Sequence, residues 1–412
     1  MGSDLAASAE RALSEILDAV AEHAPVVAVP SPPGAGKTGL VERVAAFAAV
    51  IAGETVGVAT TTRAQAQELV VRLSTWESVH AAWWAPRSRS AATTSEIAVV
   101  SRPDEFPVHH GVVVATAAKW ARAPRSMHFD LLIVDEAWQM PFGQFAPLIS
   151  LADRFLLVGD PGQIAPVVQV NVSRWADDPA GPHRPAPDVL RARGVPGLVE
   201  VALPATRRLP ADTARIVSDA FYPTMPFGSL APDSALRSAS WLGRGSLAIT
   251  EVGDQQVGIY DPDLISQAAE IVHGVIEDGT IEDGGDVRKV GPADVGVVCS
   301  YVHQVPQMRS ALGTSLRGVF VETANRWQGL ERDVIVGVHP LSGQPAPSEF
   351  AMDGGRICVM CSRHKTACLL IGRPGLELAA SAGSGAAERT FGDSTAAAGW
   401  QAHARLLEAV HR

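Results

Sequence analysis

Short apolar runs alternate with amphipathic segments along the first half of the chain. The runs that predict buried strands are Val26–Val29, Thr55–Thr60, Val112–Ala115, Leu131–Val134 and Phe155–Val158. The segments with helical periodicity include Gly39–Ala52 and Arg63–Leu73. Strands that are apolar throughout are typical of a parallel sheet that helices cover on both faces. The first half therefore predicts an α/β unit.

A second alternation of the same kind begins near Leu198, after a Pro/Arg-rich stretch at 177–196 that is typical of a linker or insertion. Its predicted strands are Val199–Leu203, Leu247–Val252, Val295–Cys299, Val319–Glu322, Val334–Val338 and Cys368–Ile371. Its predicted helices are Ala211–Ala220, Leu264–Ile276 and Val302–Leu312. The pattern predicts a second α/β unit, and ligands of such sheets bind at the carboxyl ends of the strands.

These patterns divide the chain into three parts. We expect a first domain at 1–196, with a small insertion near 76–111, and a second domain at 197–378. A flexible segment and a C-terminal helix, Ala396–Val410, would follow at 379–412. That amphipathic helix would either pack back on its own protein or bind a protein partner.

Composition narrows the class of protein. A chain of 412 residues with 47% hydrophobic residues can bury several cores, and a net charge of −10 argues against a globally basic nucleic-acid-binding surface while allowing a local basic groove. Cys358 and Cys361 have zinc-like spacing without a second pair, so we interpret them as core residues of a helix. Neither a signal peptide nor a membrane-spanning run is visible, which predicts a cytoplasmic protein.

The segment SPPGAGKT, Ser31–Thr38, follows the first predicted strand and precedes a helical pattern. Strand, Gly-rich turn and helix start are the context of a phosphate-binding loop (Walker A), in which backbone N–H groups surround phosphate oxygens. Lys37 would reach the β- and γ-phosphates, and Thr38 would ligate Mg²⁺. Ser31 stands where the pattern usually has Gly. The nucleotide-binding residues that this loop predicts are Pro33, Gly34, Ala35, Gly36, Lys37, Thr38 and Gly39.

Two later strand ends carry polar residues that suit the same chemistry. LLIVDEAWQ, Leu131–Gln139, ends a strand in two acids: Asp135 can hold Mg²⁺, and Glu136 can act as general base on the attacking water. VGDPGQIAP, Val158–Pro166, places Gln163 within reach of the γ-phosphate and that water. Gln163 ranks above Asp160 as the functional residue, since Asp160 could instead form a turn.

The order GAGKT, DEAWQ, GDPGQIAP resembles motifs I, II and III of superfamily 1 helicases. LPATRRLP at 203–210 resembles motif IV of the branch with a QYRMHP-type pattern, VETANRWQGLERDVIV at 321–336 resembles motif V, and CVMCSRHK at 358–365 resembles motif VI. VGVVCSYVHQV at 295–305 keeps the tyrosine and glutamine of the family's TPYxxQ pattern, as Tyr301 and Gln304. The resemblance covers most of the chain.

The resemblance implies α/β architecture with two tandem RecA-like domains, parallel sheets and an interdomain nucleotide cleft, and ATP with Mg²⁺ as substrate and cofactor. It also implies that Arg207, with Arg208 as a competitor, and Arg363 stabilise the transition state, and that Glu331 contacts the ribose. Structural ion pairs are the alternative for each of these side chains. No glutamine precedes the loop to read adenine, so preference for ATP comes from the resemblance alone.

The resemblance further implies single-stranded DNA or RNA as a partner that is held through its backbone. The residues in the matching positions are Thr60, Thr61, Thr116, Thr323 and Gln328. Trp120, Trp138 and Trp327 lie next to motifs and would either stack on bases or pack in cores. We therefore expect an ATP-dependent translocase or helicase. An NTP-dependent switch or assembly ATPase is the alternative. The acidic net charge favours it, and so do the short spaces between motifs, which leave little room for accessory domains.

Overall fold

The protein is described from a computed structural model over residues 2–86, 97–124, 126–166, 168, 171–175, 177–241, 244–253, 258–344, 347–381 and 394–411. The chain forms two compact units. The N-terminal unit consists of Ala6–Pro161 and Ala165–Pro204. The C-terminal unit consists of Ala205–Arg412 together with Met1–Leu5 and Gly162–Ile164.

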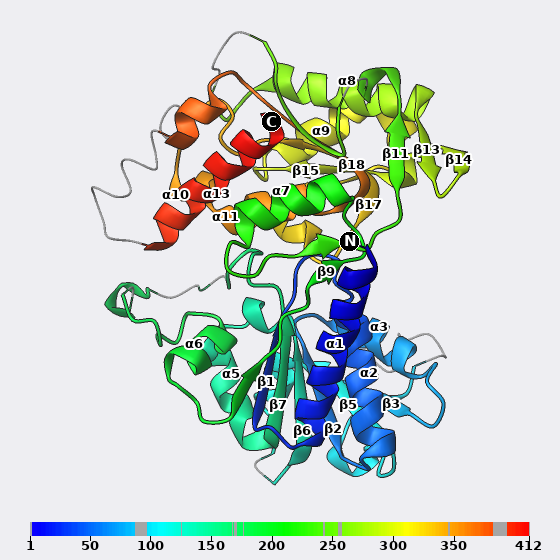
Figure 1. Ribbon diagram of the computed structural model, residues 1–412, viewed down its shortest axis with the longest axis vertical. Coiled ribbons are helices and arrows are strands. Elements are labelled where there is room, and N and C mark those ends of the chain that lie inside the picture. The colour runs from blue at the N-terminus through cyan, green and yellow to red at the C-terminus, as the bar shows by residue number, and fades with distance from the viewer. Residues whose placement is uncertain are drawn as a thin grey trace. The chain divides into compact units, whose positions relative to one another are not determined.

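The N-terminal unit is built on an eight-stranded sheet in the order β4-β3-β5-β2-β6-β7-β1-β8, and every neighbouring pair is parallel (Figure 1). Its strands are β1 Val26–Pro30, β2 Val56–Thr60, β3 His80–Trp84, β4 Val99–Val100, β5 Gly111–Thr116, β6 Phe129–Asp135, β7 Ala152–Gly159 and β8 Leu198–Glu200. All of the strands predicted in the first half are present.

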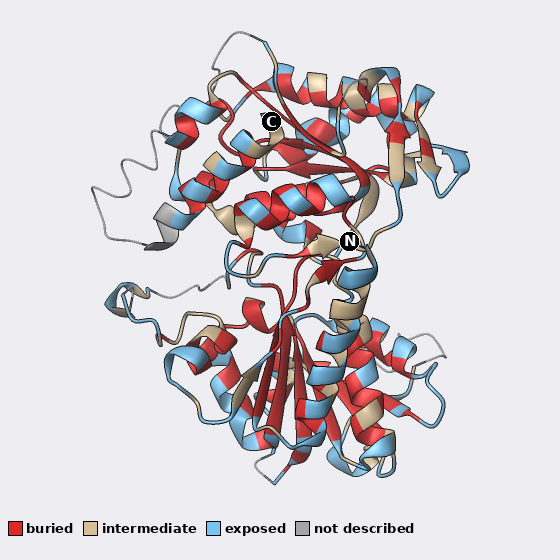
Figure 2. Cartoon of the chain, in the orientation of Figure 1, coloured by how far each residue is buried: buried red, intermediate tan, exposed pale blue. Residues whose placement is uncertain are grey.

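Helices lie on both faces of this sheet, as the apolar strands predicted. The helices are α1 Gly2–Ala21, α2 Lys37–Ala46, α3 Arg63–Leu73, α4 Ala117–Trp120, α5 Phe142–Phe145 and α6 Ala186–Ala192, with π-helical η1 Phe47–Ile51 and 3-10 turns η3 Pro103–Glu105, η4 Ala137–Gln139, η5 Ala146–Leu151 and η6 Ser173–Trp175. Alternate strand residues enter two cores, with Val56 and Val58 packed beside α1–α3 and Ala59 beside α4–α6. The strands are therefore buried on both sides (Figure 2).

Two expectations about the sheet's edges differ from the structure. The strand predicted at Val199–Leu203 does not open the second unit: β8 pairs in parallel with β1, and residues to Pro204 belong to the N-terminal unit. The region predicted as a small insertion at 76–111 supplies edge strands, since β3 pairs with β5 and β4 with β3. Their short apolar runs lie far along the chain from their partners, so local pattern alone does not place them.

The C-terminal unit is built on a five-stranded parallel sheet in the order β12-β18-β17-β15-β16. A three-stranded antiparallel sheet, β11-β13-β14, and the parallel pair β10-β9 accompany it. The strands are β9 Ala205–Thr206, β10 Gly228–Ser229, β11 Ser234–Arg237, β12 Leu247–Glu251, β13 Thr280–Asp283, β14 Asp286–Lys289, β15 Val295–Cys299, β16 Phe320–Thr323, β17 Arg332–Val338 and β18 His364–Gly372.

Helices again cover both faces of the five-stranded sheet. They are α7 Ala211–Phe221, α8 Pro262–Asp278, α9 Gln304–Leu312, α10 Glu349–Met352, α11 Gly354–Cys361 and α13 Ser394–His411, with 3-10 turns η7 Ala239–Trp241, η8 Pro292–Asp294, η9 Thr314–Leu316 and η10 Ala324–Trp327. Helices α8 and α9 share a core with one face of β15, β17 and β18, and α7, α11 and α13 share a core with the other.

The C-terminal helix α13 packs on the C-terminal unit itself. Trp400, Leu406 and Leu407 are buried in the core that also contains α7 and α11. This packing supports the first of the two roles expected for the helix, because its apolar side is occupied. Cys358 and Cys361 are buried on α11, so the prediction that they are core residues is confirmed. Within the described part of the chain, every helix falls short of the length and apolarity that a membrane span requires.

Candidate active site

The phosphate-binding loop connects the carboxyl end of β1 to the first residue of α2. Gly34 and Gly36 have φ values of 69° and 88°, in the left-handed region that glycine adopts without strain. A Cβ atom placed on Gly36 would meet no atom within 4 Å, so the hollow inside the loop is open. Because α2 begins at Lys37, its unpaired N–H groups are directed to this hollow, which suits an anion.

Ser31 fits the position that glycine usually occupies. Its backbone N–H donates to the Gly159 carbonyl at 2.8 Å, which ties the loop to β7, and its hydroxyl donates to the Val29 carbonyl at 3.1 Å. The side chain is fully buried, and Ser31 is not among the residues with positive φ. The departure from the usual motif therefore leaves the loop's backbone intact.

Lys37 is held at the mouth of the loop by two oxygens. Its Nζ atom lies 3.6 Å from the buried Oδ2 atom of Asp160 and 3.4 Å from the Pro32 carbonyl. Asp160 follows β7, which is the neighbour of β1 in the sheet. Asp160 therefore positions the lysine, a role that sequence reasoning ranked below Gln163. The position of Asp160 in the GDPGQ motif is the sequence signal that could have indicated this role.

Asp135 ends β6, the other neighbour of β7, and Glu136 directly follows it. Burial, together with the negative charge of Glu136, raises the pKa of Asp135 to about 7, although Lys37 opposes the shift. Glu136 has φ 56° and ψ 42°, a conformation that is strained for a residue other than glycine. The side chain of Gln139 donates to the Glu136 carboxylate at 3.1 Å, so the DEAWQ motif itself fixes the direction of the acid.

These residues fit a magnesium-bound nucleoside triphosphate. The Thr38 hydroxyl and the buried Asp135 carboxylate are hard oxygen ligands of the kind that Mg²⁺ takes alongside phosphates. The open loop suits phosphate oxygens, and the Lys37 ammonium matches their charge.

In the C-terminal unit, two basic motif residues, Arg208 and Lys365, pair with Glu331. Arg208 Nε donates to the Glu331 carboxylate at 2.7 Å, and Lys365 Nζ lies 3.0 Å from its other oxygen. Burial would raise the pKa of Glu331, but the charges of Arg208 and Lys365 hold that pKa below its ordinary value. Arg208 also donates to the Ser362 carbonyl at 3.2 Å, which connects motifs IV, V and VI.

The arginines proposed to act on phosphate have different surroundings. Arg207 is exposed, and no hydrogen bond or ion pair to its side chain is found among the described residues. Arg363 is only 1% exposed and donates to the Val359 carbonyl and to the Ser362 hydroxyl, each at 3.3 Å. The predicted water contact, Gln163, is also buried and belongs to the C-terminal unit. The backbone of Gln163 packs closely on Gly355, since a Cβ atom placed on Gly355 would lie 2.5 Å from the Gln163 carbonyl oxygen.

Arg207 of the C-terminal unit directly follows β9, and the expectation that the chemistry lies at carboxyl strand ends holds throughout the N-terminal unit. There Lys37 follows β1, Asp135 ends β6 and Asp160 follows β7. In the C-terminal unit, by contrast, Glu331 directly precedes β17 and Arg363 directly precedes β18. The expectation is wrong for these two residues because the segments that lead into parallel strands reach the sheet at its amino edge.

The residues predicted to hold nucleic acid do lie at carboxyl ends. Thr60 ends β2, Thr116 ends β5 and Thr323 ends β16, while Gln328 directly follows η10. Thr60 is buried and its hydroxyl donates to the Thr62 carbonyl at 3.0 Å, whereas Thr61 is exposed in front of α3. Their contacts with a strand stay predictions.

The three tryptophans near the motifs are core residues. Trp120 donates its indole N–H to the Val58 carbonyl at 2.9 Å, and Trp327 donates to the Val297 carbonyl at 3.0 Å. Trp138 donates to a carboxylate oxygen of Asp188 at 3.2 Å. All three are buried, so none presents a ring face to a base.

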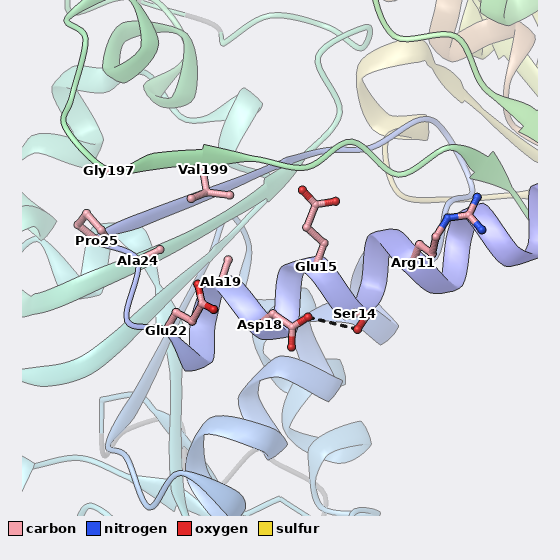
Figure 3. A pocket seen from close by; sticks show the side chains of 10 residues that line it. All are labelled: Arg11, Ser14, Glu15, Asp18, Ala19, Glu22, Ala24, Pro25, Gly197 and Val199. Atoms are coloured by element: carbon pink, nitrogen blue, oxygen red, sulfur yellow. Dashed lines mark hydrogen bonds between the residues drawn. The ribbon is translucent and has the colours of Figure 1, made fainter.

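A cavity of about 580 Å³ lies near the amino-terminal ends of β1 and β8 in the N-terminal unit (Figure 3). It is lined by one side of α1, by Pro25, which directly precedes β1, and by Val199 of β8. Its carboxylates, Glu15, Asp18 and Glu22, make it unsuited to phosphate. This cavity is therefore separate from the phosphate-binding loop, which follows the carboxyl end of β1.

Comparison with known proteins gives matches over both units. A family model described as an AAA domain matches residues 10–183, and a second model with the same description matches residues 251–375. The DNA replication ATP-dependent helicase/nuclease JHS1 of Arabidopsis thaliana is 26% identical over 283 residues, which are 63% of this chain and 20% of that protein. The chain thus spans about a fifth of the length of that curated relative.

Solved helicases share similarity over most of this chain. The arterivirus nonstructural protein 10 (helicase), solved as a complex with DNA, has 16% identity and a TM-score of 0.48 over 86% of this chain and 63% of that one. The PRRSV helicase has 15% identity and a TM-score of 0.46 over 89% of this chain and 54% of that one.

The loop, the parallel sheets and the AAA-domain matches define a P-loop nucleotide-binding protein with two α/β domains. Within that class, the ordered motifs and the helicase relative support the superfamily 1 helicases as the family of this chain, and one AAA-domain match falls on each of its two units for most of its length.

Proposed function

We propose that this chain hydrolyses ATP and uses the energy to move along single-stranded nucleic acid, with unwinding of duplexes as a possible consequence of that movement. The observation that supports this most directly is the cluster of Lys37, Asp135, Glu136 and Asp160 at neighbouring strand ends beside an open phosphate-binding loop. The helicase relative supports the nucleic-acid part of the proposal.

In the proposed reaction, Lys37 binds the β- and γ-phosphates and Asp160 keeps its ammonium at the loop. Glu136 orients a water molecule and accepts its proton as the water oxygen bonds to the γ-phosphorus and the bond to the ADP oxygen breaks. Mg²⁺, held through Thr38 and Asp135, would add positive charge at the phosphate oxygens. Asp135 must be ionised for this role, although burial and Glu136 raise its pKa, and a bound cation would lower that pKa.

The family resemblance supports a cycle in which residues of both units act on one nucleotide. Arg207 and Arg363 would stabilise negative charge in the transition state, Gln163 would contact the attacking water, and Glu331 would contact the ribose. The backbone of the nucleic-acid strand would be held by Thr60, Thr61, Thr116, Thr323 and Gln328. Contacts with the backbone bind a strand without preference for its sequence.

The test is ATPase activity with and without matched single-stranded DNA and RNA. Wild-type protein is expected to be stimulated by at least one strand, and the stimulation should fall steeply as salt rises because phosphate contacts release counterions. Glu136→Gln should bind ATP and lose turnover. Hydrolysis that neither strand stimulates at low salt would contradict the motor and favour an NTP-dependent switch.

A further inference from the structure

Five side chains of the C-terminal unit lie in one continuous row, which we call the aromatic stack. The ring centroids of Tyr260 and His303 are 4.3 Å apart at an interplanar angle of 28°, and those of His303 and Tyr301 are 5.6 Å apart at 17°. Tyr301 and Phe350 follow at 5.4 Å and 30°. The Arg356 guanidinium, 3.7 Å over the Phe350 ring, ends the row.

The inner members of the stack are held by hydrogen bonds. Buried Gln304 accepts from the backbone N–H groups of Ser300 and Tyr301 at 3.0 and 3.1 Å, which fixes the turn after β15. Gln344 donates to the Tyr301 hydroxyl, and a ring nitrogen of His303 lies 3.0 Å from the Ile259 carbonyl. Rings that are fixed in advance lose little entropy when another ring stacks on them.

The stack lies beside a strand end that is predicted to hold nucleic acid. Strands β15 and β16 are neighbours, and Cys299 pairs in register with Thr323 at their carboxyl ends. Arg356 extends this connection, since its Nη1 donates to the side chain of Asn325 at 2.6 Å. The stack therefore begins at Tyr260 and ends at the segment that follows Thr323.

The outer end of the stack is open. Tyr260 is 64% exposed although one face of its ring covers His303, and Phe350 is 43% exposed along the row. Tyr260 presents a ring face of the kind on which bases stack irrespective of sequence.

We propose that one unpaired base of the bound strand stacks on Tyr260 and continues the aromatic stack, while Thr323, at the other end of the stack, holds the backbone at a different position of the same strand. This inference rests on the proposed function, because it assigns a base-binding position to the same strand. It adds a contact with the base to a set of predicted contacts that otherwise involve only the backbone.

The test compares Tyr260→Ala with Tyr260→Trp, which keeps an aromatic face, and with Val287→Ala, a control at a 65% exposed position on β14. Fluorescence anisotropy measures binding to oligothymidylate and to a strand of the same length made of abasic deoxyribose phosphates. Tyr260→Ala is expected to bind oligothymidylate about fivefold more weakly or worse. Its affinity for the abasic strand should be unchanged, and Tyr260→Trp and Val287→Ala should keep the wild-type preference.

Equal affinities of wild type and Tyr260→Ala for oligothymidylate, or an equal loss on both strands, would overturn the inference. Thermal melting and ATPase activity without nucleic acid must match wild type in each variant, which excludes a folding defect. If wild type binds neither strand, the proposed function fails and the inference fails with it. If wild type binds strands and is stimulated by them but shows no preference for bases, the inference alone is wrong.

Discussion

The carboxyl group of Asp135 is buried next to a second acid. Its pKa in the folded protein, about 7, is well above the ordinary value of 3.8, and the causes are burial and then the charge of Glu136. Between these two pH values the folded protein binds a proton that the unfolded chain releases. Stability therefore falls as pH rises from about 4 to about 7, and above that range the full cost of ionising Asp135 is present.

Asp135→Asn should consequently stabilise the metal-free protein at pH 8, by on the order of 2 kcal/mol, and the gain should shrink toward zero near pH 4. The same substitution should abolish binding of Mg²⁺ with nucleotide. Denaturation curves at both pH values, without metal, measure the first effect. A gain in stability that does not depend on pH would show that the carboxylate is not the cause.

The neighbouring arginines of motif IV differ in their partners. Arg208 pairs with Glu331, a carboxylate that is also shared with Lys365, whereas Arg207 is exposed. An arginine that already serves a structural ion pair is less available for phosphate, so the structure favours Arg207 as the residue that acts on the nucleotide. Sequence alone could not separate two adjacent arginines.

Arg207→Ala should retain the melting temperature and nucleotide affinity of wild type and should lower ATP turnover about 100-fold or more. Arg208→Ala should instead cost about 1 kcal/mol of stability, since the Glu331 side chain of the pair is partly exposed and its charge is partly screened. Melting curves, binding of a fluorescent ATP analogue and steady-state hydrolysis distinguish the two variants. Exchanged phenotypes would assign the catalytic role to Arg208.

Among the elements, α13 is the one whose role the sequence left open. Leu406 is fully buried in the core shared with α7 and α11, so Leu406→Ala should destabilise the protein by about 2–5 kcal/mol. Gln401, exposed on the same helix, provides the control, and Gln401→Ala should leave stability unchanged. Chemical denaturation measures both. A neutral Leu406→Ala would mean that α13 does not contribute to this core.

Sequence periodicity predicted elements that are long and apolar, and it failed where pairing is remote. Strands β1, β2, β5, β6 and β7 are apolar on both faces and were all expected. The membership of β8 in the first sheet depends on its pairing with β1, which lies more than 150 residues earlier. The antiparallel strands β11, β13 and β14 carry exposed polar residues, so no apolar run marked them.

The residues of the candidate active site also divide into those that the sequence predicted and those that it did not. Motif spacing predicted the loop, Asp135 and Glu136, because each follows a strand whose end the apolar pattern locates. It could not predict that Asp160 holds Lys37, since an aspartate in GDPG also suits a turn. Nor could it find the aromatic stack, whose members Tyr260, His303 and Phe350 come from three separate loops and helices.

At the scale of the whole molecule, each unit has its own two cores and its own parallel sheet. The residues that would bind phosphate and Mg²⁺ all belong to the N-terminal unit: Lys37, Thr38 and Asp135, with Asp160 holding Lys37 in place. The arginines proposed for the transition state belong to the C-terminal unit. Binding and turnover should therefore be separable by dividing the chain.

A fragment of residues 1–204 should fold, since it contains all eight strands of its sheet, and should bind ATP within about tenfold of the affinity of the whole chain. Single-stranded nucleic acid should not stimulate its hydrolysis, because Arg207, Arg363 and the Thr323 segment are missing. Lys37→Ala in the same fragment is the control and should abolish binding. Strand-stimulated turnover by the fragment would place the whole catalytic apparatus in one unit, and a folded fragment that cannot bind ATP would show that the second unit contributes to binding itself.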